Sequence, residues 1–323
     1  MDIITIKAKK NDAGKRLDNF LVDLLPEISR AKVQKAIKSA DLVLVNGKKR
    51  KPSYIICAED KIKYHKEIGF KKQLKKILPE KKLFEIIFEN NNYIAVNKEA
   101  GLSVHGTGDH HQNNLINRII AYCPKINEVT FDKSEISKFR PGIIHRLDKD
   151  TTGVIIFAKN IKSLEYLANQ IRNRQVTKIY HTLVYGWPQK TGELRSKLSR
   201  DKKNRLKMTE GLEGKIALSN YKTLNYFQTK KDKQRLALLE INLSTGRTHQ
   251  IRVQLKGLGF PVVGDKIYKT QESELISKKL GVKRQLLHAK RFEFNGSNRI
   301  VIKIQSNLPK DFKKILSNLI EIK

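Results

Sequence analysis

Apolar residues recur along this chain at helical spacing in some stretches and in alternation in others. In residues 17–25 they lie three and four apart, which predicts an amphipathic helix. Residues 30–39 repeat this spacing directly after Ser29, a residue type that caps helix N-termini well. Between residues 42 and 64, apolar runs flank Asn46-Gly47, a pair typical of tight hairpin turns. The pattern predicts a small N-terminal domain of two helices and a hairpin.

Residues 67–83 interrupt the apolar pattern. Lysine pairs give this stretch a strong positive charge, and Pro79 breaks any helix within it. We therefore predict a basic linker here. Beyond it, apolar runs with strand or helix spacing continue along the chain. They predict strands at 84–87, 93–97, 154–158, 178–186, 219–224, 235–243 and 300–304, and helices at 114–123, 160–173, 248–255 and 311–320.

One charged, turn-prone run, residues 140–153, lies between two apolar segments. The apolar segment after it is β-branched and too short for a helix, so it predicts a buried strand. A loop held between such segments carries function more often than packing. Within it, Asp148 has Arg146 two residues before and Lys149 directly after. Nearby cations keep a carboxylate ionised, as a nucleophile or base requires; the alternative is a solvated loop whose charges pair locally.

Three further positions and one segment are candidates for chemistry or RNA contact. Tyr180 lies on a predicted strand, where a tyrosine taken alone is more often a core aromatic than a catalyst. Arg247 sits at a strand-to-helix turn, a usual place for a functional side chain. Lys98, shortly before the tight turn at Gly101, is a candidate phosphate contact. Residues 190–215 are polar and basic, which predicts a hairpin or long loop over a nucleic acid, the alternative being a disordered insertion.

Charge restricts the possible partners of this protein. The 323 residues include 66 Lys and Arg against 32 Asp and Glu, a formal net charge of +34. Such an excess is too large for a neutral enzyme of small metabolites. It indicates a polyanion, most simply RNA or DNA, bound with salt-sensitive affinity. A Lys-, Asn- and Ile-rich composition can also reflect a biased genome, so part of the excess can be passive.

The sequence gives no sign of a metal site, a disulfide framework or a membrane span. Cys57 and Cys123 are far apart, and no further ligand stands near His110-His111 at a plausible spacing. No apolar run approaches the length of a span, and the first residues lack a signal-peptide pattern. Residues 259–266 nearly fit a Walker loop, but Asp265 stands where the lysine must be. We expect a soluble, cytoplasmic protein.

The N-terminal domain, residues 1–66, carries a basic surface. Every outward charge on its second predicted helix is positive, which disfavours a merely solvated face. The order of elements resembles the alpha-L RNA-binding domain first found in a ribosomal protein, on Arg16-Leu17-Asp18, Ser29-Arg30, residues 43–47 and Asp60. The candidates for RNA contact are Arg16, Arg30, Lys32, Lys35, Lys48 and Arg50.

Four stretches of the remaining chain, residues 84–323, match one pattern in order: 97–102, 140–153, 178–180 and 246–252. Together they resemble the RluA-type pseudouridine synthases, and the RNA-binding domain ahead of them resembles the large-subunit ribosomal RNA branch. Glu99 and Thr152 depart from the usual proline and serine, outside the inferred chemistry, so we expect a changed turn and not lost activity. The resemblance implies an α+β fold with a mixed, mainly antiparallel sheet and flanking helices.

The resemblance also implies isomerisation of uridine to pseudouridine in RNA, without metal or cofactor, by breaking the N1–C1′ bond and forming a C5–C1′ bond. Asp148 would be the catalytic carboxylate, attacking the uracil ring or the sugar carbon or assisting loss of uracil. Tyr180 would stack on the uracil and could remove the C5 proton, and Arg247 would pair with Asp148. The target must leave its helix by base flipping, and Arg146 resembles the residue that fills the vacated place. The other expected RNA contacts are His145, Lys203 and Arg205.

Two alternatives keep the RNA partner: a transfer RNA pseudouridine synthase, and a catalytically idle RNA-binding factor in ribosome assembly. An idle relative would be expected to lose one of Asp148, Tyr180 and Arg247, and all three are present. A phosphotransferase is excluded because a kinase catalytic loop needs Asp directly after Arg, whereas Leu147 separates Arg146 from Asp148. We expect a monomeric RNA-modifying isomerase.

Overall fold

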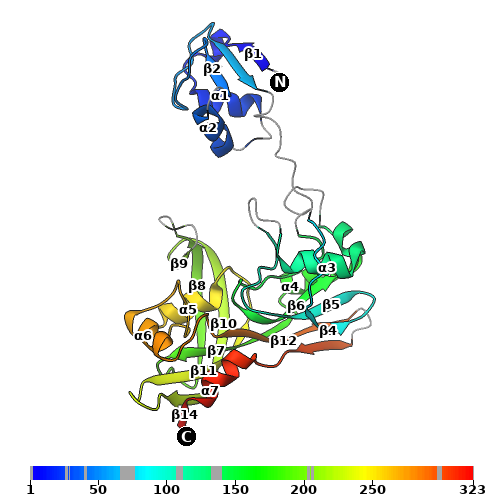
Figure 1. Cartoon of the computed structure of the whole chain (residues 1–323), viewed down its shortest axis with the longest axis vertical. Helices are drawn as coiled ribbons and strands as arrows, with labels where there is room; N and C mark the ends of the chain where they lie inside the picture. The colour runs from blue at the N-terminus through cyan, green and yellow to red at the C-terminus, as the bar shows by residue number, and fades with distance from the viewer. Residues whose placement is uncertain are drawn as a thin grey trace. The chain divides into compact units, whose positions relative to one another are not determined.

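The computed structural model describes residues 3–25, 28, 30–39, 42–65, 77–106, 112–131, 140–201, 204, 207–296 and 300–322. The chain divides into two compact units, Met1–Lys76 and Ile77–Lys323 (Figure 1). Several predicted features lie outside the described residues: the Ser29 cap, most of the basic linker, the His110-His111 pair, and the RNA-contact candidates Lys203 and Arg205. Each unit is described below by itself.

The first unit packs two helices against a small antiparallel sheet, as the sequence predicts. Its elements are β1 Ile3–Lys7, η1 Lys10–Asp12, α1 Leu17–Leu24, α2 Arg30–Lys38, β2 Val43–Val45 and β3 Lys61–His65. The sheet order is β1-β3-β2. Asn46 and Gly47 both have positive φ, 51° and 72°, which is the backbone of a type I′ turn. Apolar side chains spaced by helical turns, such as Leu17 and Leu21, fill the core between helices and sheet.

The second unit is built on one large mixed sheet. Its strands are β4 Glu85–Glu89, β5 Tyr93–Lys98, β6 Thr152–Ala158, β7 Thr177–Tyr185, β8 Thr191–Arg200, β9 Met208–Glu210, β10 Lys215–Gln228, β11 Arg235–Leu243, β12 Leu287–Asn295, β13 Val301–Gln305 and β14 Ile320–Ile322. Within the described residues the order is β4-β5-β6-β12-β7-β11-β10-β8-β9, with β13 on β12 and β14 on β10. The β6–β12 pair is parallel and the other described pairs are antiparallel, so the predicted mixed, mainly antiparallel α+β fold is confirmed.

Helices flank this sheet (Figure 1). They are α3 Leu115–Tyr122, η3 Pro124–Glu128, α4 Ile161–Arg172, α5 Gln250–Gly257, α6 Gln271–Lys279 and α7 Lys310–Ser317. Strand β6 is buried on both faces, because Ile155 and Phe157 join the cluster that contains α3 while Val154 and Ile156 join the one that contains α4. This explains why β6 is an unbroken apolar run instead of an alternating one. The loop that precedes β6 is therefore anchored to the most buried part of the unit.

The structure moves two of the predicted boundaries and decides between two interpretations of a third segment. Residues 77–83 were assigned to the linker, but Ile77 is buried in the main core and the backbone of Leu78 accepts a hydrogen bond from the Asn117 side chain. The last predicted helix ends at Ser317, and β14 follows it. The basic segment 190–215 belongs to a hairpin, in which β8 pairs with both β9 and β10. Of the two readings of that segment, the hairpin is the one confirmed for its described residues.

Candidate active site

Two buried basic side chains, Lys98 and Arg284, hold the loop before β6 in place. Lys98 is 1% exposed, and its Nζ donates to three backbone carbonyls, those of Glu99, Leu102 and Lys149, each at 2.8 Å. Arg284 Nη1 donates to the carbonyl of Asp150 at 3.1 Å. Burial lowers the pKa of Lys98 to about 7. The prediction that Lys98 contacts phosphate is wrong, because all three of its donors are used inside the protein.

Gly153 fixes the other end of the same loop. Its φ of +106° is unfavourable for other residues, and a Cβ built there would lie 2.2 Å from the carbonyl oxygen of Ala289. The close approach comes from the parallel pairing of β6 with β12, in which Gly153 faces Ala289. The glycine at the end of the charged run is thus needed to seat the loop against the sheet.

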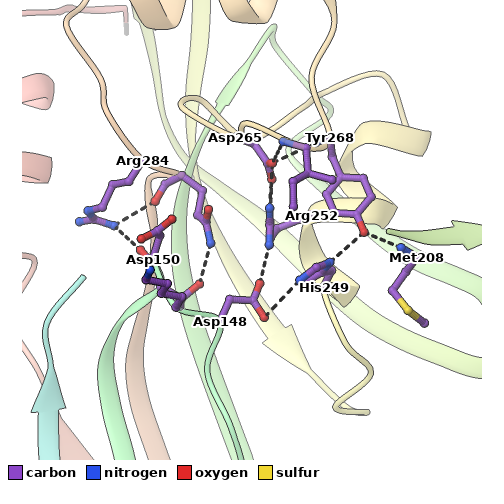
Figure 2. A network of polar contacts seen from close by, with 12 residues as sticks. Asp148, Asp150, Met208, His249, Arg252, Asp265, Tyr268 and Arg284 are labelled. Carbon is purple, nitrogen blue, oxygen red and sulfur yellow. Dashed lines mark hydrogen bonds and ion pairs between the residues drawn. The ribbon is translucent and has the colours of Figure 1, made fainter. Parts of the chain in front are cut away.

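Asp148 lies on this loop and forms a hydrogen-bonded ion pair with an arginine from α5. Arg252 Nη1 donates to Asp148 Oδ2 at 2.8 Å, and its Nε and Nη2 donate to the two oxygens of Asp265 at 2.7 and 2.9 Å (Figure 2). Arg252 is 4% exposed. Burial alone would lower the pKa of Arg252, but Asp265 and Asp148 together raise it above its usual value. Arg252 therefore stays charged and fixes one oxygen of Asp148.

The predicted pairing of Arg247 with Asp148 is wrong. Arg247 lies in the exposed turn before α5, and its Nε donates to the carbonyl of Ile216 on β10 at 3.1 Å. Arg252, five residues later, is on the inner side of the helix and reaches the carboxylate. The motif was located correctly, but its second arginine makes the ion pair.

His249 lies beside the other oxygen of Asp148. Its backbone is left-handed, with φ 54°, and its Nε2 is 4.0 Å from Asp148 Oδ1. Tyr268 Oη accepts the Met208 N–H at 2.7 Å and lies 2.9 Å from His249 Nδ1 (Figure 2). The Tyr268 hydroxyl can donate to Nδ1 or accept from it, so this contact fits either imidazole tautomer. Burial lowers the pKa of His249, which favours a neutral imidazole beside the carboxylate.

Tyr180 and Asp148 line one cavity of about 870 Å³, and Arg247 lines it too. The structure thus brings the three predicted catalytic residues to a single site. Tyr180 is 7% exposed, and burial, with the nearby charge of Asp148, raises its pKa above the usual range. A neutral phenol is a poor proton acceptor, so the geometry favours Tyr180 as a stacking surface over a base.

Arg146 and His145 line the same cavity but differ in exposure. Arg146 is exposed. His145 stacks on Phe292, with ring centroids 4.9 Å apart, and its Nε2 accepts the Ile156 N–H at 3.2 Å. Burial lowers the pKa of His145 to about 3, so it is neutral at physiological pH. It supports the loop and offers RNA no positive charge.

The basic candidates of the first unit fall into two groups. Arg16 and Arg30 both hydrogen-bond to the buried carboxylate of Asp18, at 3.0–3.2 Å, and Gln34 donates to it at 2.6 Å. The hydrogen bonds from Arg16 lead the effects that lower the pKa of Asp18. The other candidates are exposed on the surface: Lys32, Lys35, Lys48 and Arg50.

The described residues contain no group of three or more His, Cys, Asp or Glu arranged to hold a metal ion. Among the same residues, no helix combines the length and apolar character that crossing a bilayer requires. The cavity around Asp148 is instead rich in cations, which suits a polyanionic ligand.

Comparison with known proteins decides the family. Residues 92–256 match the RNA pseudouridylate synthase family, and residues 15–62 match the S4 domain. The chain belongs to the RNA pseudouridine synthases. An uncharacterised RNA pseudouridine synthase of Bacillus subtilis is 32% identical over 99% of both chains. The ribosomal large subunit pseudouridine synthase D of Pseudomonas aeruginosa is 32% identical over 95% of this chain and 92% of its own.

A solved structure supports the fold. The human RNA pseudouridylate synthase domain containing 1 aligns with a TM-score of 0.59 and 20% identity, over 75% of this chain and 90% of its own. The resemblance to RluA-type synthases and the front RNA-binding domain are both confirmed.

Sequence reasoning missed three members of this synthase's polar network: Arg252, Asp265 and His249. Two of them stand in the 246–252 motif, but spacing alone does not tell which side chain turns inward. A signal for Arg252 existed, since it lies between the apolar residues Ile251 and Val253 on a helix that is buried nearly all round. A buried arginine requires a carboxylate partner, and Asp265, which belongs to a smaller match with the same family pattern (residues 261–265), was not assigned that role.

Proposed function

We propose that this synthase converts uridine to pseudouridine in large-subunit ribosomal RNA, with Asp148 as the catalytic carboxylate. The observation that carries the assignment is the setting of Asp148. The Asp148 side chain is 23% exposed and lines a basic cavity together with Tyr180. The buried side chain of Arg252 forms an ion pair with it. The RNA class comes from relatives named ribosomal large subunit pseudouridine synthase D, which are 32% identical over 95% of this chain.

The two oxygens of Asp148 have different surroundings, which suggests how the carboxylate acts. Oδ2 accepts from Arg252, whereas Oδ1, within the described part of the chain, lies 4.0 Å from His249 Nε2, beyond hydrogen-bonding distance. Oδ1 is therefore the oxygen available to the substrate. The reaction breaks N1–C1′, forms C5–C1′, moves a proton from C5 and returns one to N1. Attack on the ring, attack on the sugar carbon and assisted loss of uracil are all compatible with this placement.

Tyr180 and Arg146 suit the two roles that base flipping requires, which are to bind the flipped base and to fill the place it leaves. The Tyr180 hydroxyl has no hydrogen-bond partner among the described residues, and its neutral ring forms part of the cavity wall on which uracil can stack. Arg146, exposed two residues before Asp148, can enter the place that the flipped base leaves. The unpairing cost of the flip is offset by these contacts.

RNA binding by this synthase is shared between its two units. The S4 domain supplies exposed lysines, and the basic hairpin of the second unit supplies more. We propose that the protein acts in the cytoplasm and as a monomer, the latter because Asp148, Arg252 and Tyr180 all come from one chain.

The decisive experiment maps pseudouridines in ribosomal and transfer RNA from cells with and without this protein. We expect specific uridines of large-subunit RNA to lose modification, and the purified wild-type protein, but not Asp148→Asn, to restore them on an unmodified transcript. If pseudouridines were lost from transfer RNA alone, the substrate would be transfer RNA and not ribosomal RNA. Unchanged maps, with no turnover in vitro, would favour an idle assembly factor.

A further inference from the structure

Lys178 is a buried cation without a partner. It is 6% exposed, on β7, and no hydrogen bond or ion pair joins its ammonium to any described residue. Burial, and then the positive charge of Arg247, lowers the pKa of Lys178 to about 8. No carboxylate counts among these effects. A partly desolvated charge without a counter-ion is unfavourable in the free protein.

Arg247, which is exposed, is a second cation without an acidic partner among the described residues. The hydrogen bond from Nε to the Ile216 carbonyl is the only one its side chain makes to a described residue, which leaves the two terminal nitrogens without an acceptor among those residues. That bond orients the guanidinium without neutralising it. Lys178 and Arg247 both line the cavity that holds Asp148. Two cations that lack acidic partners at one cavity wall define a site for an anion.

The position of Lys178 identifies which anion. Lys178 and Tyr180 lie two residues apart on β7 and so point to the same face, about 7 Å apart along the strand. A uridine stacked on Tyr180 would have its ribose and flanking phosphates within this short reach. An ammonium and a guanidinium at one site suit the doubly oxygenated face of a phosphodiester.

We propose that Lys178 and Arg247 form a subsite for a backbone phosphate directly beside the target uridine. This inference rests on the proposed function and deepens it: the binding energy gained at the phosphate holds the extruded nucleotide over Asp148. Lys178 remains unpaired in the free protein because its counter-ion arrives with the RNA. Arg247, which does not pair with Asp148, acquires a role in substrate binding.

The main test removes one charge from each side of the contact. The RNA is a short strand around a mapped target, with a neutral methylphosphonate in place of the phosphate 5′ or 3′ to the uridine. For wild type, one of the two replacements should weaken binding by about 10-fold to 100-fold, as expected for a charge-assisted bond. Lys178→Met should bind the all-phosphate RNA more weakly than wild type by a similar factor. The sensitive methylphosphonate replacement should then weaken binding by Lys178→Met by less than about 2-fold more, because both changes remove the same contact. If the loss of affinity from Lys178→Met and the loss from the methylphosphonate simply multiplied, the proposed subsite would be refuted.

Controls separate this contact from general charge. Lys178→Arg retains a cation and should keep sensitivity to the methylphosphonate. Lys162→Met removes an exposed lysine on α4, outside the cavity lining, and should leave the affinity for the short strand within about 2-fold. If Lys162→Met weakened binding as much as Lys178→Met, net charge would explain the effect and the proposal would fail.

Thermal stability gives a second, independent readout. Removing an uncompensated buried charge should leave the melting temperature of Lys178→Met unchanged or raise it, even though RNA binding weakens. A lowered melting temperature would mean that Lys178 supports the fold. If no RNA is modified by the wild-type protein, the same binding cycle on a uridine-rich decamer still tests the subsite, so its failure and that of the proposed function are distinguishable.

Discussion

Two basic sites, one in each unit of this synthase, differ in whether their cations have an acidic partner. In the S4 domain, Arg16 and Arg30 share the buried carboxylate of Asp18. At the catalytic cavity, Lys178 and Arg247 have no acidic partner among the described residues. In the first case the positive charges stabilise the fold, and in the second they are left for a ligand. The comparison teaches that a basic residue is best judged by the carboxylate that accompanies it.

The same distinction holds within the second unit, between its two most buried lysines. Lys98 donates to three carbonyls and holds the loop of Asp148 in place. Lys178 is nearly as buried and donates to none that the structure describes. Burial alone therefore does not separate a structural lysine from a binding one, whereas the count of satisfied donors does.

The largest expected effect is on catalysis. Asp148→Asn keeps the shape of the side chain but removes the charge that Arg252 orients. We expect pseudouridine formation to fall by about 10³-fold or more, with RNA affinity within a few-fold of wild type. Single-turnover assays and filter binding measure the two quantities. Glu165→Gln, an exposed amide substitution on α4, serves as control, and normal turnover by Asp148→Asn would refute the assignment.

The next effect separates the two arginines of the 246–252 motif. Arg252→Met leaves Asp265 and Asp148 without their buried partner, so the free energy of unfolding should fall by about 3–5 kcal/mol, and turnover should fall with it. Arg247→Met should lower RNA affinity with little change in stability, because only one bond to a backbone carbonyl is lost. Chemical denaturation of both variants checks this, and equal destabilisation would contradict the contrast.

Arg247 and Arg252 also show that only part of the structure could be predicted from the sequence alone. Periodic apolar runs were sufficient to predict α1, α4, β6 and β11, because their burial follows directly from spacing. Strand β12 was not assigned, since charged residues interrupt its alternation and it enters the sheet between β6 and β7, far away in sequence.

Some residues of the candidate site could likewise be predicted from the sequence, and others could not. Asp148 and Tyr180 were predicted as site residues from their sequence motifs, and both line the cavity. The partner of Asp148 could not be chosen, because it depends on how α5 returns to the loop and on Asp265, which lies 13 residues after Arg252. Lys98 ends strand β5 and Lys178 lies at the start of β7, and the acceptors around them, which distant segments supply, distinguish the two lysines.

A smaller effect is expected at Asp18 in the S4 domain. Its folded-state pKa lies below the unfolded value of about 3.9, so its ion pairs stabilise the domain at neutral pH, and this contribution is lost as the pH falls below about 4. Asp18→Asn should cost about 2 kcal/mol at pH 7 and flatten that acid dependence. Melting curves of the full chain between pH 3 and 7 measure it; an unchanged acid profile would mean that the arginines are not held by this carboxylate.

The smallest effect concerns the S4-domain lysines that have no carboxylate. Lys32 and Lys35 are exposed on α2 and make no ion pair with a described residue, so phosphate contact is the role left to them. The double variant Lys32→Ala/Lys35→Ala should reduce the slope of log affinity against log salt by about 2 on structured RNA, because each lost phosphate contact removes roughly one released counter-ion. Stability should not change, since neither side chain supports the core. The same RNA measured with Asp18→Asn provides the contrast: there the fold weakens while the basic surface keeps its charge, and a salt slope that fell as far as in the lysine variant would mean that the paired arginines also bind phosphate.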